Sequence, residues 1–143
     1  MTKLTEDFDR WSVDVDGYVV ERVSVGLHAA VELRFQRGEE YLEAAVSRAP
    51  SLVLVPPDAP AWRPADDAPP VSLVPLLALV GARVSMLEVW KDGRLAIVLG
   101  DGTELAVEPS ERFEAWQLLD DEFNVYCGVG KDEPAVLRQT AAT

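Results

Sequence analysis

The sequence repeats its own apolar pattern after 64 residues, and this repeat constrains the fold more than any other feature. Residues 13–55 align without a gap with residues 77–119. Apolar residues coincide at many positions: Val20 with Val84, Val23 with Leu87, Val31 with Leu95, Leu33 with Ile97, Phe35 with Leu99, Leu52 with Trp116 and Leu54 with Leu118. Two pairs of glycines also coincide, Gly17 with Gly81 and Gly38 with Gly102. Chance and the general likeness of β-hairpins are competing explanations, but shared glycines favour shared turns and therefore an internal repeat.

Each half has the pattern of an antiparallel meander of about four strands. The strands expected in the first half are 19–25, 30–35, 41–46 and 51–55, and those in the second half are 83–90, 95–99, 104–107 and 114–119. The pair Asp92-Gly93 predicts a hairpin with a type I′ turn, and Gly100-Asp101-Gly102 predicts a second hairpin. The predicted fold is mainly β, with the two meanders packed as one sandwich or barrel-like domain.

The segment that joins the halves is rich in proline. Residues 56–70 hold six prolines and predict a connecting loop, because proline cannot donate a ladder hydrogen bond. After this loop, Ser72 is placed to cap at most one short helix near 72–80, which Gly81 would end. The repeat favours an extended segment here instead, so both interpretations stay open. The domain is expected to span residues 1–130, and residues 131–143 to form a partly flexible tail.

Size and composition indicate one globular domain in a reducing compartment. The chain has 143 residues, 48% of them apolar, which suits a single core. The N-terminus lacks the apolar stretch of a secretory signal, and the apolar run 71–82 is interrupted and shorter than the roughly 20 residues that span a bilayer. The single cysteine, Cys127, cannot form an internal disulfide. A cytoplasmic location is therefore expected.

The net charge of −12 limits the classes of partner. Nucleic acids and anionic lipids are disfavoured, because binding them requires clustered Lys and Arg. A basic protein is electrostatically the easiest partner to attract, although net charge also serves solubility alone.

The sequence offers little that supports catalysis. Only one histidine, His28, is present, and its position between two strands favours a solvated turn. Cys127 has no evident activating partner, and zinc would need more Cys or His ligands. The acidic groups Asp14-x-Asp16, Asp66-Asp67 and Asp120 to Glu122 lack the spacing of a metal-binding loop. We predict no enzyme activity, no metal and no cofactor.

Two features are candidates for partner binding. The stretch from residue 104 to 122 has one basic residue, Arg112, against seven carboxylates: Glu104, Glu108, Glu111, Glu114, Asp120, Asp121 and Glu122. Strand alternation predicts that Glu104 and Glu108 point outward, so an acidic face results, which is either a binding surface or a solvated edge. Trp62 in the proline-rich loop is either an interface anchor or a ring folded over the core, whereas Trp116 is expected in the core.

Several motifs resemble an uncharacterised family of small bacterial proteins over residues 11 to 130. They are Gly81-x-x-Val84, Gly93-Arg-Leu95, Asp101-Gly-Thr-Glu-Leu105-x-Val107 and Glu114-Ala-Trp116-x-Leu118. The family ends in a glycine-rich turn and another tryptophan, and here Cys127-Gly-Val-Gly130 supplies the glycines without that tryptophan. The resemblance implies no established activity. By analogy, small acidic proteins of this kind resemble immunity proteins that neutralise toxins.

The expected function is a non-catalytic, immunity-like protein-binding module that presents an acidic surface to a basic protein. Two alternatives stay open. One is a structural or self-associating protein, and the other is a small-molecule-binding protein with a pocket between the repeats.

Overall fold

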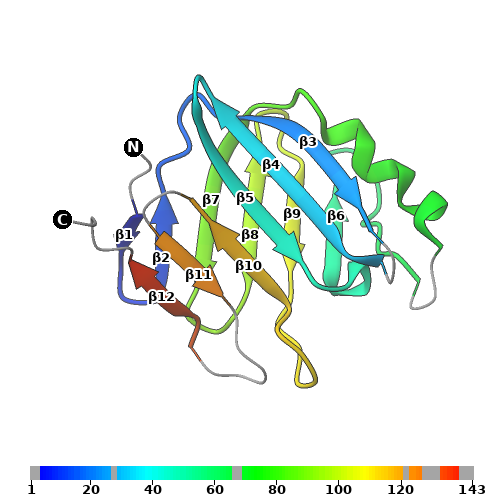
Figure 1. Ribbon diagram of the computed structural model, residues 1–143. Coiled ribbons are helices and arrows are strands. Elements are labelled where there is room, and N and C mark those ends of the chain that lie inside the picture. Colours follow the sequence, from blue (N-terminus) through cyan, green and yellow to red (C-terminus); the bar gives the residue numbers. More distant parts are fainter. Residues whose placement is uncertain (1–3, 27–28, 66–68, 121–122, 127–132, 139–143) are drawn as a thin grey trace.

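The computed structural model is a sandwich of two antiparallel sheets with six strands each (Figure 1). It describes residues 4–26, 29–65, 69–120, 123–126 and 133–138, and the statements below concern these residues. The strand order is β1-β2-β7-β8-β9-β6 in sheet A and β12-β11-β10-β5-β4-β3 in sheet B. The predicted mainly β class is confirmed. Each sheet has two end strands, so the architecture is the sandwich and not the barrel-like form.

The chain builds both sheets from short elements. Sheet A contains β1 (Leu4–Glu6), β2 (Arg10–Val13), β6 (Leu52–Val55), β7 (Val84–Trp90), β8 (Leu95–Leu99) and β9 (Glu104–Val107). Sheet B contains β3 (Val19–Val25), β4 (Val31–Arg37), β5 (Glu40–Val46), β10 (Trp116–Leu119), β11 (Phe123–Tyr126) and β12 (Ala135–Arg138). Two 3₁₀ helices, η2 (Ala49–Ser51) and η3 (Pro70–Leu79), complete the fold.

The two halves of the chain exchange their fourth strands. The meander β3-β4-β5 lies in sheet B and β7-β8-β9 in sheet A, but β6 pairs with β9 and β10 pairs with β5. The expected meanders are therefore present in their first three strands, and the fourth strand of each half pairs with the meander of the other half. The segments that cross between the sheets are tied together, because Ser47 donates its backbone N–H to the Ala115 carbonyl (3.0 Å) and Glu108 donates to that of Ser51 (3.0 Å).

Corresponding residues of the two halves have corresponding backbone geometry. Val20 pairs with Phe35, and Val84, which is 64 residues later, pairs with Leu99; a β-bulge or irregularity follows both pairs. The Val20 N–H donates to the Ala82 carbonyl (2.9 Å), and the Val84 N–H donates reciprocally to the Tyr18 carbonyl (3.0 Å). This geometry agrees with the repeat. That the halves arose from one sequence stays a prediction.

The alignment of the halves changes at their third strands. Val31 pairs with Val46 in sheet B, and Leu95 pairs with Val107 in sheet A. The matching residues of β5 and β9 are thus 61 apart and not 64, because the second hairpin is three residues shorter. The predicted match of Gly38 with Gly102 is therefore not an equivalence of position.

The second predicted hairpin is confirmed, with Gly100, Asp101 and Gly102 between β8 and β9, but the turn between β7 and β8 differs from the prediction. A type I′ turn needs positive φ at two successive residues. Gly93 has a φ of 102°, whereas Ala29 is the one non-glycine residue with positive φ in the described part of the chain, so Asp92 does not meet this requirement. Trp90 donates its N–H to the Arg94 carbonyl (2.8 Å), which leaves a three-residue loop. Such loops typically join a type I turn to a residue with positive φ, here the glycine.

The helix η3 confirms the interpretation of residues 72–80 as a short helix, with a different start and cap. It begins at Pro70, with Pro69 as its N-cap, and the Ser72 hydroxyl donates to the Pro69 carbonyl (2.7 Å) instead of capping a later helix. A 3₁₀ helix has three residues per turn, so Leu73, Leu76 and Leu79 form one buried row. Pro75 lacks the N–H that a strand would need, which explains why the extended alternative is wrong.

The helix η3 lies beside β3, the end strand of sheet B (Figure 1). A helix in this position protects the strand edge from pairing with another chain. The buried apolar residues from both sheets and η3 form one core cluster. In the part of the chain that the structure describes, no helix is long and apolar enough to cross a bilayer.

The C-terminal segment contributes more than the sequence predicts. Ala135–Arg138 forms β12 and pairs with β11, although residues 131–143 were expected to lie outside the domain. Val136 packs against the core cluster. The sheet continues here because β11 offers a free edge to a segment too short to show periodicity by itself.

Candidate functional site

The predicted acidic residues of β9 point outward. Leu105 and Val107 are buried, while Glu104 and Glu108 are exposed, as strand alternation predicts. Glu104 lies at one end of β9, and Glu108 follows its other end. The backbones of these two residues therefore lie about 14 Å apart along the strand direction, at roughly 3.4 Å per residue.

The carboxylates that follow β9 share their end of the sandwich with arginines. Glu108 and Glu111 line a hollow of about 540 Å³ together with Arg48, Arg112 and Phe113. Glu108 also forms an ion pair with Arg63 (3.4 Å). Because three arginines lie near these acids, the structure does not gather the predicted residues into one purely acidic face.

The remaining predicted acids lie elsewhere. Asp120 follows β10 and is only 8% exposed, so the prediction that its side chain joins an exposed acidic face is wrong. It continues the alternation of β10, in which Trp116 and Leu118 are buried and Gln117 and Leu119 are only partly buried. Glu114 is exposed, and its carbonyl accepts a hydrogen bond from the Ser47 hydroxyl. Asp121 and Glu122 lie outside the described residues.

Trp62 extends the edge of sheet A. Its backbone N–H donates to the Leu54 carbonyl (2.7 Å), and its carbonyl accepts from the Leu54 N–H (2.8 Å). The side chain is partly buried and packs against the core cluster. Trp62 was interpreted either as an interface anchor or as a ring folded over the core, and the structure contains the contact with the core.

The other candidate residues for a catalytic or metal site are His28, Cys127 and the acidic groups outside β9. His28, Cys127 and Asp66-Asp67 lie outside the described residues. Asp14 accepts a hydrogen bond from the Asp16 N–H (3.2 Å) through its carboxylate. Among the described residues, no group of three or more His, Cys, Asp or Glu side chains is close enough to hold a metal ion.

The outward face of sheet A is mostly apolar, with two glutamates among its residues. Strand pairing places Val55, Glu104, Val98 and Met86 in one row across β6, β9, β8 and β7. The next row contains Val53, Ala106, Ala96 and Glu88. Val55 and Met86 remain 37% and 40% exposed. Trp90 follows Met86 and Glu88 on the same side of β7. We call the nine residues Val53, Val55, Met86, Glu88, Trp90, Ala96, Val98, Glu104 and Ala106 the sheet A face.

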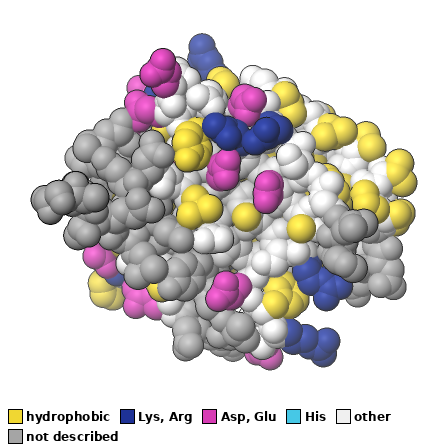
Figure 2. All heavy atoms as spheres, in the orientation of Figure 1, with side chains coloured by type: hydrophobic (Ala, Val, Ile, Leu, Met, Phe, Trp, Pro, Cys, Tyr) yellow, Lys and Arg dark blue, Asp and Glu magenta, His cyan; other side chains and the backbone are white. Residues whose placement is uncertain are grey.

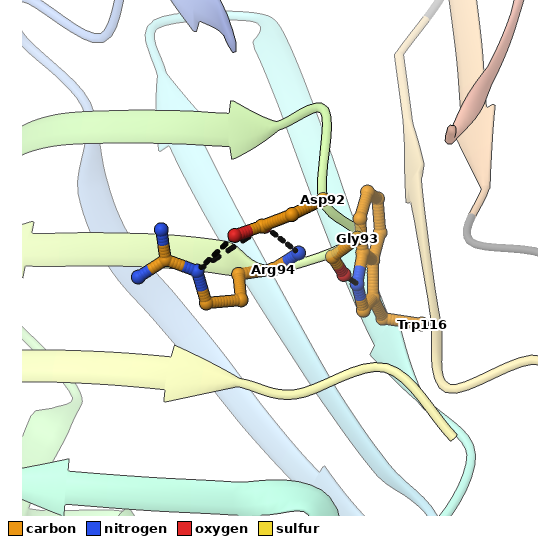
Figure 3. A network of polar contacts seen from close by, with 4 residues as sticks. All are labelled: Asp92, Gly93, Arg94 and Trp116. Atoms are coloured by element: carbon orange, nitrogen blue, oxygen red, sulfur yellow. Dashed lines mark hydrogen bonds and ion pairs between the residues drawn. The ribbon is translucent and has the colours of Figure 1, made fainter. Parts of the chain in front are cut away.

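One side of the sheet A face carries an aromatic ring flanked by two arginines. The guanidinium carbons of Arg10 and Arg94 lie 4.6 and 4.8 Å from the centre of the Trp90 ring. Arg10 also forms an ion pair with Glu88 (2.8 Å), and Arg94 forms one with Asp92 (2.9 Å; Figure 3). Each cation–π contact of this kind at an exposed site stabilises a protein by about 0.5–1 kcal/mol. The ion pairs and the ring contacts fix the positions of both guanidinium groups.

The outward face of sheet B is charged at the matching positions. Val98 lies opposite Glu104 in sheet A just as Arg34 lies opposite Glu43 in sheet B. Arg34 forms ion pairs with Glu43 (3.2 Å) and Glu21 (3.7 Å), and its guanidinium lies 4.5 Å from the centre of the Tyr41 ring. Figure 2, which views this side of the molecule, shows basic and acidic side chains gathered over sheet B. The fold therefore does not need an apolar outward face.

Comparison with known proteins assigns the chain to a family. The model of a family described as "Family of unknown function (DUF6188)" matches residues 11–130. The chain belongs to this family. No curated protein and no solved structure matches it. The resemblance expected from the motifs is thus confirmed at the level of an uncharacterised domain.

In this DUF6188 domain, the matched region contains every residue of the sheet A face. Sequence reasoning missed this face, yet a signal was present. In β8, the run Leu95-Ala-Ile-Val-Leu99 is apolar at every position, while its counterpart Val31-Glu-Leu-Arg-Phe35 alternates. An unbroken apolar strand indicates burial on both faces or an exposed apolar face.

Proposed function

We propose that this DUF6188 chain is a non-catalytic protein-binding module that binds a basic partner through the sheet A face. The observation that carries the proposal is the contrast between the two sheets. At matching positions, Ala96 and Val98 in sheet A replace Glu32 and Arg34 in sheet B. Exposed apolar patches on soluble proteins are characteristic of interaction sites.

The composition of the face suits a protein contact. Tryptophan and arginine are the residues most enriched at the energetic centres of interfaces. Trp90 with Arg10 and Arg94 supplies such a group, already held by ion pairs. The small and branched apolar side chains Ala106 and Val98, which are partly exposed, lose little conformational entropy when covered.

Charge favours a basic partner at longer range. The net charge of −12 attracts a cationic protein before contact and raises the association rate. The exposed acids Glu108, Glu111 and Glu114, which follow β9 in the sequence, are part of that negative charge. The analogy with small acidic binding proteins favours an immunity-like role, in which the chain neutralises a basic toxin.

The test compares two apolar surfaces of the same molecule. Besides the sheet A face, η3 exposes an apolar row in which Val74 and Leu77 are 54% and 49% exposed. The variant Val55→Asn/Met86→Gln makes the sheet A face polar, and Val74→Asn/Leu77→Gln makes the same kind of change on η3. Each tagged protein is used to capture partners from a lysate of the source organism, and the captured proteins are quantified by mass spectrometry.

We expect a basic protein to be retained by the wild type and the η3 variant and lost from the sheet A variant. Isothermal titration of that protein, once purified, should give the same order of affinities. Retention by all three proteins, or loss only from the η3 variant, would contradict the proposed surface. Circular dichroism of both variants checks that the fold is kept.

A second candidate function, small-molecule binding, has one favourable observation. A hollow of about 690 Å³ lies between the two halves, lined by Asp14, Asp16 and Tyr18 from the first and by Arg83 and Ser85 from the second. A screen of metabolites by thermal shift would reveal such a ligand as a rise in Tm that Arg83→Ala removes. No shift with any class of metabolite would count against this candidate.

A further inference from the structure

One carboxylate position lies opposite a basic residue in sheet B and opposite apolar residues in sheet A. In sheet B, Glu43 is opposite Arg34 and forms an ion pair with it (3.2 Å). In sheet A, Glu104 is opposite Val98 on one side and Val55 on the other. Within the described residues, no ion pair to Glu104 is present. Sheet A thus keeps the acid and replaces the base with valine.

This arrangement has consequences when the sheet A face is covered. An exposed carboxylate is solvated by water and needs no cation. Once a partner covers Val55 and Val98, water leaves Glu104 as well, and a carboxylate that loses its water without gaining a cation is strongly disfavoured. A partner that binds here must therefore bring a cation to Glu104, or pay for its desolvation.

We propose that the partner places an arginine or lysine against Glu104, where Arg34 lies against Glu43 in sheet B. This inference rests on the proposed function and adds the chemistry that the partner must present, a basic side chain within an otherwise apolar contact surface. Glu104 then discriminates among partners, because a neutral or acidic residue at that point leaves the carboxylate buried without compensation.

The experiment uses random peptides displayed on phage as the probe, so that no natural partner need be known. Peptides are selected on the wild-type chain and then sorted by their loss of binding to Val55→Asn/Met86→Gln, which identifies those that use the sheet A face. The sorted peptides are synthesised, and their affinities are measured for the wild type, Glu104→Gln and the matched control Glu43→Gln in sheet B.

Peptides that use the sheet A face should contain Arg or Lys among apolar residues, and Glu104→Gln should weaken them about tenfold while Glu43→Gln leaves them unchanged. Face-binding peptides without a basic residue, or with affinities that Glu104→Gln does not change, would overturn this inference and leave the proposed function standing. An absence of peptides that depend on Val55 and Met86 would overturn both.

Two further variants distinguish a change in peptide recognition from a loss of the fold. Val98→Arg copies Arg34 and supplies Glu104 with a cation from its own chain, so the peptides should lose affinity although the fold is kept. Glu104→Lys should select a new set of peptides that carry Asp or Glu at the position of the base. Selection of the same basic peptides by Glu104→Lys would contradict the inference.

Discussion

The indole of Trp116 in sheet B donates its N–H to the carbonyl oxygen of Gly93 in sheet A, over 2.8 Å and out of contact with solvent (Figure 3). Gly93 belongs to the turn between β7 and β8, while Trp116 begins β10. This hydrogen bond therefore joins the hairpin of one half to the exchanged strand of the same half across the sandwich. It fixes the position of the turn that follows Trp90 on the sheet A face.

Replacing Trp116 with phenylalanine should destabilise the fold by about 2–3 kcal/mol, because the substitution removes a buried donor and leaves a small cavity. Urea unfolding measures the loss. The matched control is Trp90→Phe on the surface, which should cost less than about 1 kcal/mol. Equal losses for the two variants would show that the buried hydrogen bond adds nothing.

The period of η3 predicts opposite results for two neighbouring leucines. Leu76 is fully buried, while Leu77 is 49% exposed. Leu76→Ala should cost about 2–5 kcal/mol, and Leu77→Ala should change the free energy of unfolding by no more than about 0.5 kcal/mol. Comparable costs at both positions would argue against three residues per turn in this segment.

Gly81, which follows η3, has a φ of 91° and open space where a Cβ atom would stand. Gly81→Ala should therefore cost about 1–2 kcal/mol from backbone conformation alone. Gly100→Ala is the control, because the backbone of Gly100 has ordinary φ and an added Cβ would meet the Arg83 Cβ at 3.5 Å, a normal contact. Thermal unfolding should separate the two variants, and an unchanged Tm for Gly81→Ala would refute the left-handed conformation.

Asp101 gives the stability a dependence on pH. Its carboxylate accepts a hydrogen bond from the Thr103 N–H (2.8 Å), and this bond lowers the pKa of Asp101 below its ordinary value. A depressed pKa means that the stabilisation is complete above the unfolded-state pKa of about 3.9 and is lost as pH falls through the lower folded-state value. The Tm of the wild type should therefore exceed that of Asp101→Asn near neutral pH, and the difference should shrink below about pH 4. A difference that stays constant from neutral to acidic pH would show that the charge of Asp101 is not responsible.

The strands of both meanders could be predicted because their signals are local. The observed bounds of β3, β8 and β9 match the expected ranges, since alternation and glycine turns act within a few residues. The neighbour with which a strand pairs could not be predicted from such local signals. Nothing in the sequence of β6 distinguishes pairing with β5 from pairing with β9, because that choice depends on the packing of the whole sandwich.

The candidate site was harder to predict for a related reason. Alternation placed Glu104 and Glu108 outward, but it gave no sign that Arg63 returns to Glu108 from a distant loop. The strand register shows that Val98 lies opposite Glu104 as Arg34 lies opposite Glu43, and the sequence alone does not give this correspondence. Charge counted along the chain also missed the burial of Asp120, although Asp120 is in phase with the buried Trp116 and Leu118.

The central claim, that partners bind the sheet A face, is tested most directly by methyl NMR of the labelled chain with a purified partner or a selected peptide. Addition of the ligand should shift the methyl signals of Val53, Val55, Met86 and Val98 and leave those of Val71, Val74 and Leu77 on η3 in place. Shifts confined to the η3 methyl groups would place the binding surface elsewhere and contradict the account.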